Sequence, residues 1–450
     1  MRKVLLKGKK MTILLVAALL YGTASAQTQG QKETLTLTLD RALEIALSDN
    51  PTIKVAEDDI ILKRVADTEA WQNLLPEVSI GGTWQHTISA AQMKLDTMTF
   101  KMGRDNSNTV AGVLTVSLPI FAPTVYGMMA MTKTDIQLAV EKSRASKQDL
   151  VNQVTKAYYQ LMLAQDSYSV LQESYKVAEE NFNVVNAKFK QGVVSEFDKI
   201  SAEVQMRSVK PSVISAGNAV NLAKLQLKVL MGITADVDLH IEDNLSNYEA
   251  SLFVNELTDL KEGLYNNTSL RQLDLNKALL EKGLKVSKLA FAPTLGAQFT
   301  YQYQSLYNPT WNLFNYNWAG SSQLVFSLSI PIYKASNFTQ IKTARVQLRQ
   351  LNQTRIDTER KLNMQATSYR DNMQASSEQV VSNRENVVQA RKAVEIATKR
   401  YDVGAGTVLE LNNSQVSLTQ AELTYNQSIY DYLTAKADLD QVLGRNYTGK

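Results

Sequence analysis

The sequence predicts a mixed α/β membrane protein that is built from two copies of one structural unit. Three observations support this fold class: motifs that recur at a constant spacing, paired runs of alternating apolar and polar residues, and long tracts without glycine or proline. Recurrence at one spacing indicates a tandem repeat. Alternation with a period of two predicts β-strands, and the uninterrupted tracts predict unusually long helices.

The repeat is visible when the second half of the chain is laid over the first. Residues 47–76 align with residues 264–293 at an offset of 217. Residues 117–121 align with residues 329–333 at an offset of 212, which then holds to the end of both copies. The predicted organisation is, in chain order, a signal peptide at 1–26, a first repeat at 27–232, a connector at 233–253 and a second repeat at 254–450.

The first 26 residues have the pattern of a secretory signal. Five basic residues precede an apolar run at 11–20, and small residues at 24–26 form a cleavage site. The alternative is an N-terminal anchor helix, although the apolar run is short for that role. Without this segment the chain has 43 basic and 44 acidic residues, so it lacks the basic balance expected of a nucleic-acid-binding protein.

The composition also excludes several kinds of chemistry. The chain has no cysteine and two histidines, His86 and His240, so thiolate sites and zinc-type histidine pairs are ruled out. It contains no phosphate-binding glycine loop and no nucleophile motif. We therefore predict no enzymatic activity, no cofactor and no metal site. An exported chain that resides in a membrane without apolar helices needs a β-barrel.

Two pairs of strands are predicted, one pair in each repeat. Apolar residues alternate with Ser, Thr and Gln in each run, which places the apolar side chains on one face. Each run has the length of a tilted strand that crosses a bilayer. An ordinary half-buried antiparallel sheet is the alternative. The strands are expected at about 77–90, 109–121, 294–304 and 322–333.

Aromatic residues concentrate in and after these strands. Tyrosine and tryptophan favour the membrane–water interface because each has an apolar ring and a polar group. The loops at 91–108 and 305–321 are then expected to lie on one side of the membrane. The predicted interface residues are Trp84, Tyr301, Tyr303, Tyr307, Trp311 and Trp318.

A long helix is predicted after each strand pair. Residues 128–191 and 332–403 contain neither glycine nor proline, and as helices they would extend about 95–110 Å. Their sparse apolar positions and wide polar surfaces suit helices that pack side by side in a hollow wall. A solid coiled coil is the alternative, but it would not explain the strands.

Each long helix is expected to reverse at a glycine-containing turn. The turns lie at Gly192 and at Gly404 with Gly406, and Ser195 and Thr407 are candidate N-caps. The returning helices are expected at 196–231 and 408–443, with a kink or break at Pro211. Shorter helices, at about 40–74 and 254–290, lead into the strand pairs.

Several motifs resemble those of the TolC-type outer-membrane efflux proteins. They are Leu37–Leu47 followed by Asn50-Pro51, Ser117-Leu-Pro-Ile-Phe121, and Tyr401-x-x-Gly404 followed by Val408-Leu-Glu-Leu411. Each motif is weak alone, but their order, spacing and duplication agree over essentially the whole mature chain. The resemblance implies a duct of a tripartite efflux or type I secretion system.

The resemblance further implies a homotrimer in the outer membrane of a Gram-negative bacterium, extending into the periplasm. Each protomer would contribute four strands to one twelve-stranded barrel, surrounded by outer-membrane lipid, and its helices to a periplasmic α-helical barrel. The duct would passively conduct substrates, most simply small molecules such as drugs or metabolites, from a periplasmic adaptor and an inner-membrane transporter. Metal-ion efflux and type I protein secretion use the same kind of tube.

The resemblance also assigns functional positions. Glu410 corresponds to a pore-lining carboxylate, and Asn413 stands at a second constriction position that is acidic in well-known members. Asp198 and Tyr401 correspond to contacts that hold the periplasmic tips closed, near Gly192 and Gly404. Gly406 replaces a basic residue that locks the tip in some members. The alternative to these functional roles is that Glu410 and Asp198 are solvated carboxylates at helix starts.

A periplasmic coiled-coil adaptor or structural protein is the rival class. It would explain the long helices and the export signal, but it would leave the paired strands and the aromatic residues without a role.

Overall fold

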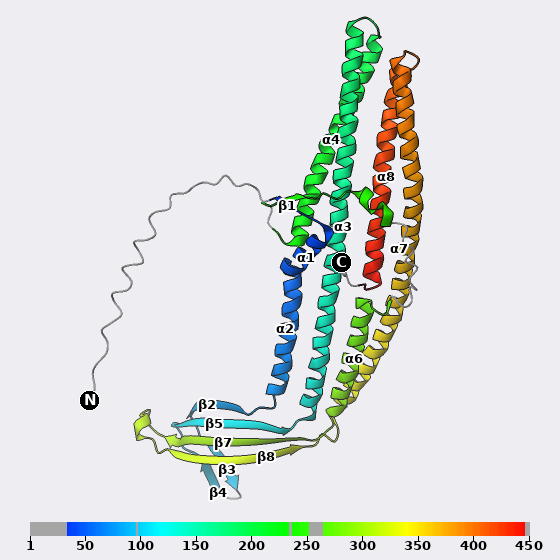
Figure 1. The fold of residues 1–450 in the computed structure, drawn as a ribbon. Helices are drawn as coiled ribbons and strands as arrows, with labels where there is room; N and C mark the ends of the chain where they lie inside the picture. The colour runs from blue at the N-terminus through cyan, green and yellow to red at the C-terminus, as the bar shows by residue number, and fades with distance from the viewer. Residues whose placement is uncertain (1–33, 96–97, 234–235, 252–263, 446–450) are drawn as a thin grey trace, which may run out of the picture.

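The computed structural model describes residues 34–95, 98–233, 236–251 and 264–445. The signal peptide expected at 1–26 lies outside these residues, as does the first part of the helix expected at 254–290. The protein consists of long, nearly parallel helices with a β-sheet at one end and two helical turns at the other (Figure 1). The fold is therefore mixed α/β.

The helices and strands keep the same order in the two halves of the chain: lead-in helix, strand pair, long helix and returning helix. The helices are α1 (Leu39–Asp49), α2 (Pro51–Gln72), α3 (Pro123–Lys190), α4 (Glu196–Met231), α6 (Thr268–Leu289), α7 (Ala335–Asp402) and α8 (Val408–Val442). The strands are β1 (Thr34–Thr36), β2 (Glu77–Thr87), β3 (Ala91–Leu95), β4 (Met98–Met102), β5 (Ser107–Phe121), β6 (Asp238–His240), β7 (Thr294–Asn308) and β8 (Ala319–Ser329). Two short 3-10 helices are η1 (Leu245–Ser251) and η2 (Leu313–Asn315).

The main sheet joins the two halves of the chain. Its strand order is β2-β5-β7-β8, and all neighbours are antiparallel. The β5–β7 pairing, for example Val116 opposite Phe299, connects one half to the other. β2 and β8 form the two edges, and each has one row of backbone groups without a partner strand among the described residues.

The expectation of a plain loop at 91–108 was wrong. This segment contains the β3–β4 hairpin, with Met93 paired to Phe100. Apolar residues alternate there with Gln, Lys and Thr, so the period-two pattern that predicts strands was present in the sequence. The segment expected as a loop at 305–321 likewise begins inside β7 and ends inside β8.

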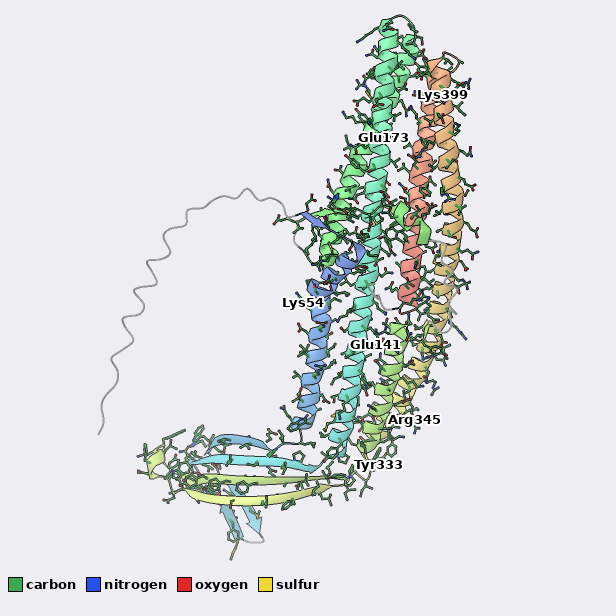
Figure 2. The ribbon with its side chains drawn as sticks, in the orientation of Figure 1. Lys54, Glu141, Glu173, Tyr333, Arg345 and Lys399 are labelled. Carbon is green, nitrogen blue, oxygen red and sulfur yellow. The ribbon has the colours of Figure 1, made fainter. Side chains whose placement is uncertain are left out.

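The two long helices run without interruption. α3 and α7 each contain 68 residues, which corresponds to about 100 Å. Charged side chains project along the outside, including Lys54, Glu173 and Lys399 (Figure 2). No helix among the described residues combines the length and the apolar character that a membrane crossing requires.

Of the kink or break expected at Pro211, the structure excludes the break, and the kink stays a prediction. α4 continues from Glu196 to Met231 with Pro211 inside it. A proline in a helix interior removes one backbone hydrogen bond and crowds the carbonyl four residues earlier. The long contact of α4 with α3 supports the helix on both sides of this residue.

The lead-in helix expected at 40–74 is two helices, because the chain leaves the helical conformation at Asn50. The Asn50 side chain caps α2 by accepting from the backbone N–H of Thr52 (2.8 Å). Its Nδ2 donates to the carbonyl oxygen of Leu230, at the end of α4 (2.7 Å). The side chain therefore bonds to the start of one helix and the end of another, and α2 begins where α4 ends.

Asn267 performs the same two functions in the second half. It caps α6 through the N–H groups of Ser269 and Leu270, and its Nδ2 donates to the carbonyl oxygen of Val442 in α8 (2.8 Å). Both asparagines are buried. We call these two contacts the asparagine joints.

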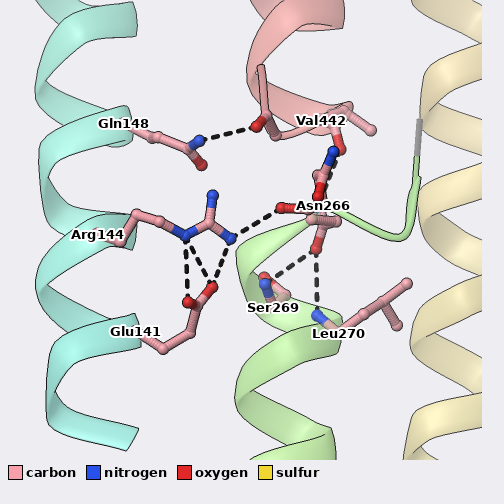
Figure 3. Close-up of polar contacts among 9 residues, drawn as sticks. Glu141, Arg144, Gln148, Asn266, Ser269, Leu270 and Val442 are labelled. Atoms are coloured by element: carbon pink, nitrogen blue, oxygen red, sulfur yellow. Dashed lines mark hydrogen bonds and ion pairs between the residues drawn. The ribbon is translucent and has the colours of Figure 1, made fainter. Parts of the chain in front are cut away.

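Side chains of α3 reinforce the second asparagine joint (Figure 3). Arg144 donates to the carbonyl oxygen of Asn266 (2.8 Å), and Gln148 donates to that of Gly444 (3.1 Å). The nearly buried Glu141 is paired with Arg144 on the same helix. The joint thus links α3, α6 and the end of α8.

The largest hydrophobic core lies at the level of the first joint. Tyr158 of α3 is completely buried there, and its hydroxyl lies within hydrogen-bonding distance of the Leu37 carbonyl and of Asp243. The short parallel pairing of β1 with β6 covers this core. Glu249 of η1 binds Arg384 of α7 (3.0 Å) and Tyr425 of α8 (2.8 Å). The middle of the molecule is therefore its most tightly connected part.

We predict that Gly444→Ala destabilises the protein more than Gly192→Ala does. Both glycines have positive φ (+65° and +74°), so both variants incur about 1–2 kcal/mol of backbone strain. A Cβ at 444 would also collide with the Asn266 backbone, whereas a Cβ at 192 would meet nothing within 4 Å. The free energies of unfolding can be compared by urea denaturation followed by circular dichroism. Equal losses for the two variants would show that the second joint tolerates the added methyl group.

Candidate functional site

One face of the main sheet is apolar across all four strands. The register places Val78, Val116, Phe299 and Leu324 in one row, and residues in a row share a face. The adjacent row on the opposite face is Ser79, Thr115, Thr300 and Gln323. The described residues leave these apolar side chains partly or largely exposed, and Ile80 is 84% exposed. Exposed apolar side chains over the whole face indicate that this face contacts something other than water.

Aromatic side chains gather where the sheet is farthest from the helices. The rings of Trp84 and Trp311 lie 4.8 Å apart, and the rings of Tyr303 and Trp318 are stacked at 5.3 Å. His86 stacks near the first pair and bonds to Asn108 (2.9 Å). The structure thus brings together four of the six predicted interface residues.

The other two predicted interface residues lie elsewhere. Tyr301 is in the middle of β7, paired with Leu114 and Ser322. Tyr307 lies against Gly103, beside the β3–β4 hairpin, and has a positive φ of 56°.

Buried polar residues hold the loop that carries Trp311. The Asn108 side chain donates to the Thr310 carbonyl (3.2 Å), and the Ser305 hydroxyl donates to the Asn317 carbonyl (2.6 Å). Asn308 donates to the Asn108 carbonyl (3.2 Å). These hydrogen bonds fix the loop over the ends of β2 and β5, which explains the contact between Trp84 and Trp311.

A second aromatic group, which the sequence reasoning missed, lies at the helix end of the strands. Phe291 and Phe338 are 5.0 Å apart, and Tyr333 is 6.0 Å from Phe338. Phe121 lies 6.3 Å from Tyr126 at the corresponding place in the first half. Tyr333 is visible where the sheet meets the helices (Figure 2). The proximity of these aromatics to the prolines that bracket the strands was the available signal.

The turn at Gly192 is held by a complete capping arrangement. Gly192 has a φ of +74°, and the N–H of Val193 donates to the Lys188 carbonyl (3.0 Å). Ser195 accepts from the N–H of Asp198, and the Asp198 carboxylate accepts from the N–H of Ser195 (both 3.2 Å). Asp198 therefore has a structural partner within its own turn, as expected for a carboxylate at a helix start.

The turn at Gly404 has the same backbone geometry but a different side-chain pairing. Thr407 accepts from the N–H of Glu410 (3.2 Å), while the Glu410 carboxylate lies 3.5 Å from Arg400. Arg400 also donates to the Ala405 carbonyl (3.1 Å). A Cβ at Gly406 would lie 3.1 Å from the Arg400 side chain, so this glycine leaves room for the pair. The positively charged side chain at this tip is therefore Arg400, and not a residue at position 406.

The two turns contact each other through Tyr401. This ring packs in a small core with Val185, Ala202 and Leu411. Lys188 lies 4.8 Å above the ring and 4.0 Å from the Asp402 carboxylate. Residues from both helical hairpins therefore meet at the tips, which we call the tip contact.

The resemblance assigned both Asp198 and Tyr401 to the tip contact, and the charge of Asp198 lies near Tyr401. The Tyr401 hydroxyl is buried and has no hydrogen-bond partner among the described residues. Burial raises the pKa of Tyr401, and the nearby charges of Asp198 and Asp402 raise it further. The hydroxyl therefore stays neutral at physiological pH.

Asn413 is exposed, and its neighbour Asn412 makes the contact between the two hairpins. Asn412 is buried and accepts from the Asn181 side chain of α3 (3.2 Å). Asn413 and Glu410 thus remain available at the surface of α8, one turn apart. No group of three or more His, Asp or Glu side chains in the described parts of the chain is arranged to hold a metal ion.

The sequence matches the profile of a family described as outer membrane efflux protein, over residues 42–233 and 260–445. It is 21% identical to the outer membrane protein TolC of Escherichia coli over 407 residues, which cover 88% of this chain and 80% of TolC. The structure resembles that of CusC, with a TM-score of 0.75, 15% identity and 95% coverage of both chains. It also resembles the outer membrane channel CmeC of Campylobacter jejuni, with a TM-score of 0.75, 15% identity and coverage of 93% and 90%.

We predict that Lys188→Gln weakens the tip contact. The variant loses the cation above Tyr401, an interaction that contributes about 0.5–1 kcal/mol at exposed sites. Amide hydrogen exchange near residues 399–411 should therefore become about two- to fivefold faster. Lys190→Gln is the matched control, because Lys190 is in the same helical turn and exposed. Tyr401→Phe should leave the exchange unchanged, whereas faster exchange would reveal a hydrogen bond from the hydroxyl.

Proposed function

Because this chain belongs to the outer membrane efflux protein family, we propose that it is the passive exit duct of an efflux assembly. Members of the family are outer-membrane channels and not enzymes. The observation that carries the proposal is the joining of two surfaces in one protein. An exposed apolar sheet face suits lipid, and helices about 100 Å long with polar surfaces suit a water-filled tube in the periplasm.

We further propose that three protomers close one twelve-stranded barrel. The four strands of one protomer leave β2 and β8 as open edges. An unsatisfied backbone group in lipid costs several kcal/mol, so an open edge there is strongly unfavourable. Pairing β2 of one protomer with β8 of the next removes every edge when three protomers meet. The helices of the three protomers would then continue the barrel into the periplasm.

This architecture supports a particular class of partner protein and a particular class of substrate. The tip contact lies at the end opposite the sheet, so it faces a periplasmic adaptor and an inner-membrane transporter. The transporter supplies the energy, and the duct conducts small molecules such as drugs or metabolites. Type I protein secretion is the second candidate, because the same tube would serve it. The exposed apolar sheet disfavours a periplasmic adaptor, which has no need of a lipid-facing surface.

The proposal is tested by recording single channels from the purified mature protein in planar bilayers, together with its oligomer mass. We expect discrete openings from a trimer. Ile80→Lys should reduce assembly in the membrane, because a lysine on the lipid face near the bilayer midplane costs about 2–4 kcal/mol. Ser79→Lys is the control on the polar face. A monomeric, water-soluble species without conductance would overturn the proposal.

We propose that Glu410 and Asn413 line the narrowest part of the duct at the tips. Three copies of Glu410 would form an anionic ring that attracts cations. The nearby Arg400, at 3.5 Å, would partly offset this charge. Glu410→Gln should therefore lower cation selectivity, and Arg400→Gln should raise it, as measured by reversal potentials in a salt gradient. Unchanged selectivity in both variants would show that the constriction lies elsewhere.

The tip contact is proposed to hold the duct closed at rest. Tyr401 and Asp402 on one hairpin engage Lys188 on the other, so opening the tips must separate these groups. In the same bilayer recordings, Lys188→Gln should increase the fraction of time that the channel is open. Asp198 would act indirectly, by fixing the first turn at Gly192.

A further inference from the structure

The β3–β4 hairpin has two chemically different faces. Its register pairs Ala91 with Met102 and Met93 with Phe100, which places these side chains and Met98 on one face. The other face carries Gln92, Lys94, Thr99 and Lys101. Every side chain described in the hairpin is exposed, and the three methionines and Phe100 are between 48% and 65% exposed. The hairpin is therefore an amphipathic surface that this protomer leaves uncovered.

The base of the hairpin is held rigidly. The Asp105 carboxylate accepts from the N–H of Ala90 (2.7 Å) and is paired with Lys101 (2.6 Å). The Tyr307 ring of β7 lies against Gly103, which leaves no room for a side chain there. The Asp105 contacts close the base of the hairpin, and the contact of Tyr307 with Gly103 joins this base to β7.

The hairpin projects from the sheet on the side away from the helices (Figure 1). The chain enters it from Ile88, which is 76% exposed, directly after the apolar positions of β2. Its base adjoins the end of the sheet where Trp84 and Trp311 meet. The exposed apolar residues of the hairpin thus follow the apolar strand β2 in the chain and lie next to the aromatic end of the sheet.

The size of the apolar face argues against a separate protein that binds through this face alone. Each strand has five residues, so the face measures about 17 Å by 10 Å, or about 170 Å². A stable protein interface buries about 800 Å² on each partner. A bilayer has no such minimum, because each inserted apolar side chain leaves water independently. The lysines of the opposite face complement phosphate-bearing headgroups.

We propose that the β3–β4 hairpin binds the outer surface of the membrane that surrounds the duct. Met93, Met98, Phe100 and Met102 insert into the acyl boundary. Lys94 faces anionic headgroups together with Lys101, whose charge is partly offset by Asp105. The occupant is the lipid layer itself. This inference rests on the proposed function, since it requires the sheet to lie in that membrane, and it adds a lipid-binding element outside the transmembrane strands.

The test uses spin labels on single cysteines in the full chain, which has no cysteine of its own. Labels at Met98→Cys and Phe100→Cys report the apolar face, and a label at Thr99→Cys reports the polar face. The protein is placed in phosphatidylcholine vesicles that contain phosphatidylglycerol. Collision rates with oxygen, which enters lipid, are compared with those for a water-soluble nickel complex. We expect the oxygen-to-nickel ratio to be severalfold higher at 98 and 100 than at 99.

Two further labels separate this proposal from the function on which it rests. Ile80→Cys and Ser79→Cys lie on opposite faces of β2. A higher ratio at 80 than at 79, with equal ratios at 98, 99 and 100, would overturn the hairpin proposal alone. Equal ratios at 79 and 80 would instead overturn the membrane placement of the sheet.

The remaining outcomes show what covers the apolar face of the hairpin. Shielding of 98 and 100 from both reagents, with spin–spin broadening, would show that a second copy covers the hairpin and would overturn the lipid assignment. A ratio at 98 that falls severalfold when phosphatidylglycerol is omitted supports headgroup binding by the lysines. A ratio that is the same in both vesicle types overturns that part of the proposal.

Discussion

The organisation of this protein depends on the need to satisfy backbone hydrogen bonds where water is absent. The main sheet has an apolar face that the described part of the chain leaves exposed, and it ends in two strands whose outer edges have no partner strand there. In the proposed assembly the neighbours supply the missing pairing. The rest of the molecule then has to place three sheets at one radius, and long helices with rigid connections to the strands are suited to that task.

The two helical tips share one backbone arrangement but differ in their side-chain contacts. A glycine with positive φ and a Ser or Thr cap reverse each long helix within a few residues. Beyond this shared backbone, the first turn uses its carboxylate to cap the helix, while the second turn leaves Glu410 near Arg400. The two halves therefore share the backbone of the turn and differ in the side-chain contacts around it.

Much of the architecture could be predicted because it is encoded locally. The long helices follow from tracts without glycine or proline, and the glycine turns follow from residues that tolerate positive φ. The division of the first helix at Asn50 was missed although its signal is local, because Asn50 is an N-cap and Pro51 is the first residue of α2. The continuity of α4 through Pro211 could not be predicted in this way, because α4 is supported by its contact with α3.

The sequence predicted where the residues of the candidate site lie, but not which residues they contact. Sequence patterns located Glu410, Asp198 and Tyr401 at the turns. They did not show that Lys188 lies over Tyr401, because that contact joins residues from two separate hairpins. The second aromatic group was missed for a related reason, since Phe291 and Phe338 meet only when the sheet and the helices are both formed.

The asparagine joints also constrain how the chain can fold. Asn50 meets Leu230, 180 positions later, and Asn267 meets Val442, 175 positions later. Contacts of such large sequence separation carry a high loop-closure entropy, and they form slowly compared with local helix formation. The lead-in helices can be capped locally as soon as they form, because each cap joins residues two or three positions apart. The carbonyl groups at the ends of α4 and α8 are bonded by the asparagines only after the beginning and the end of each half have met.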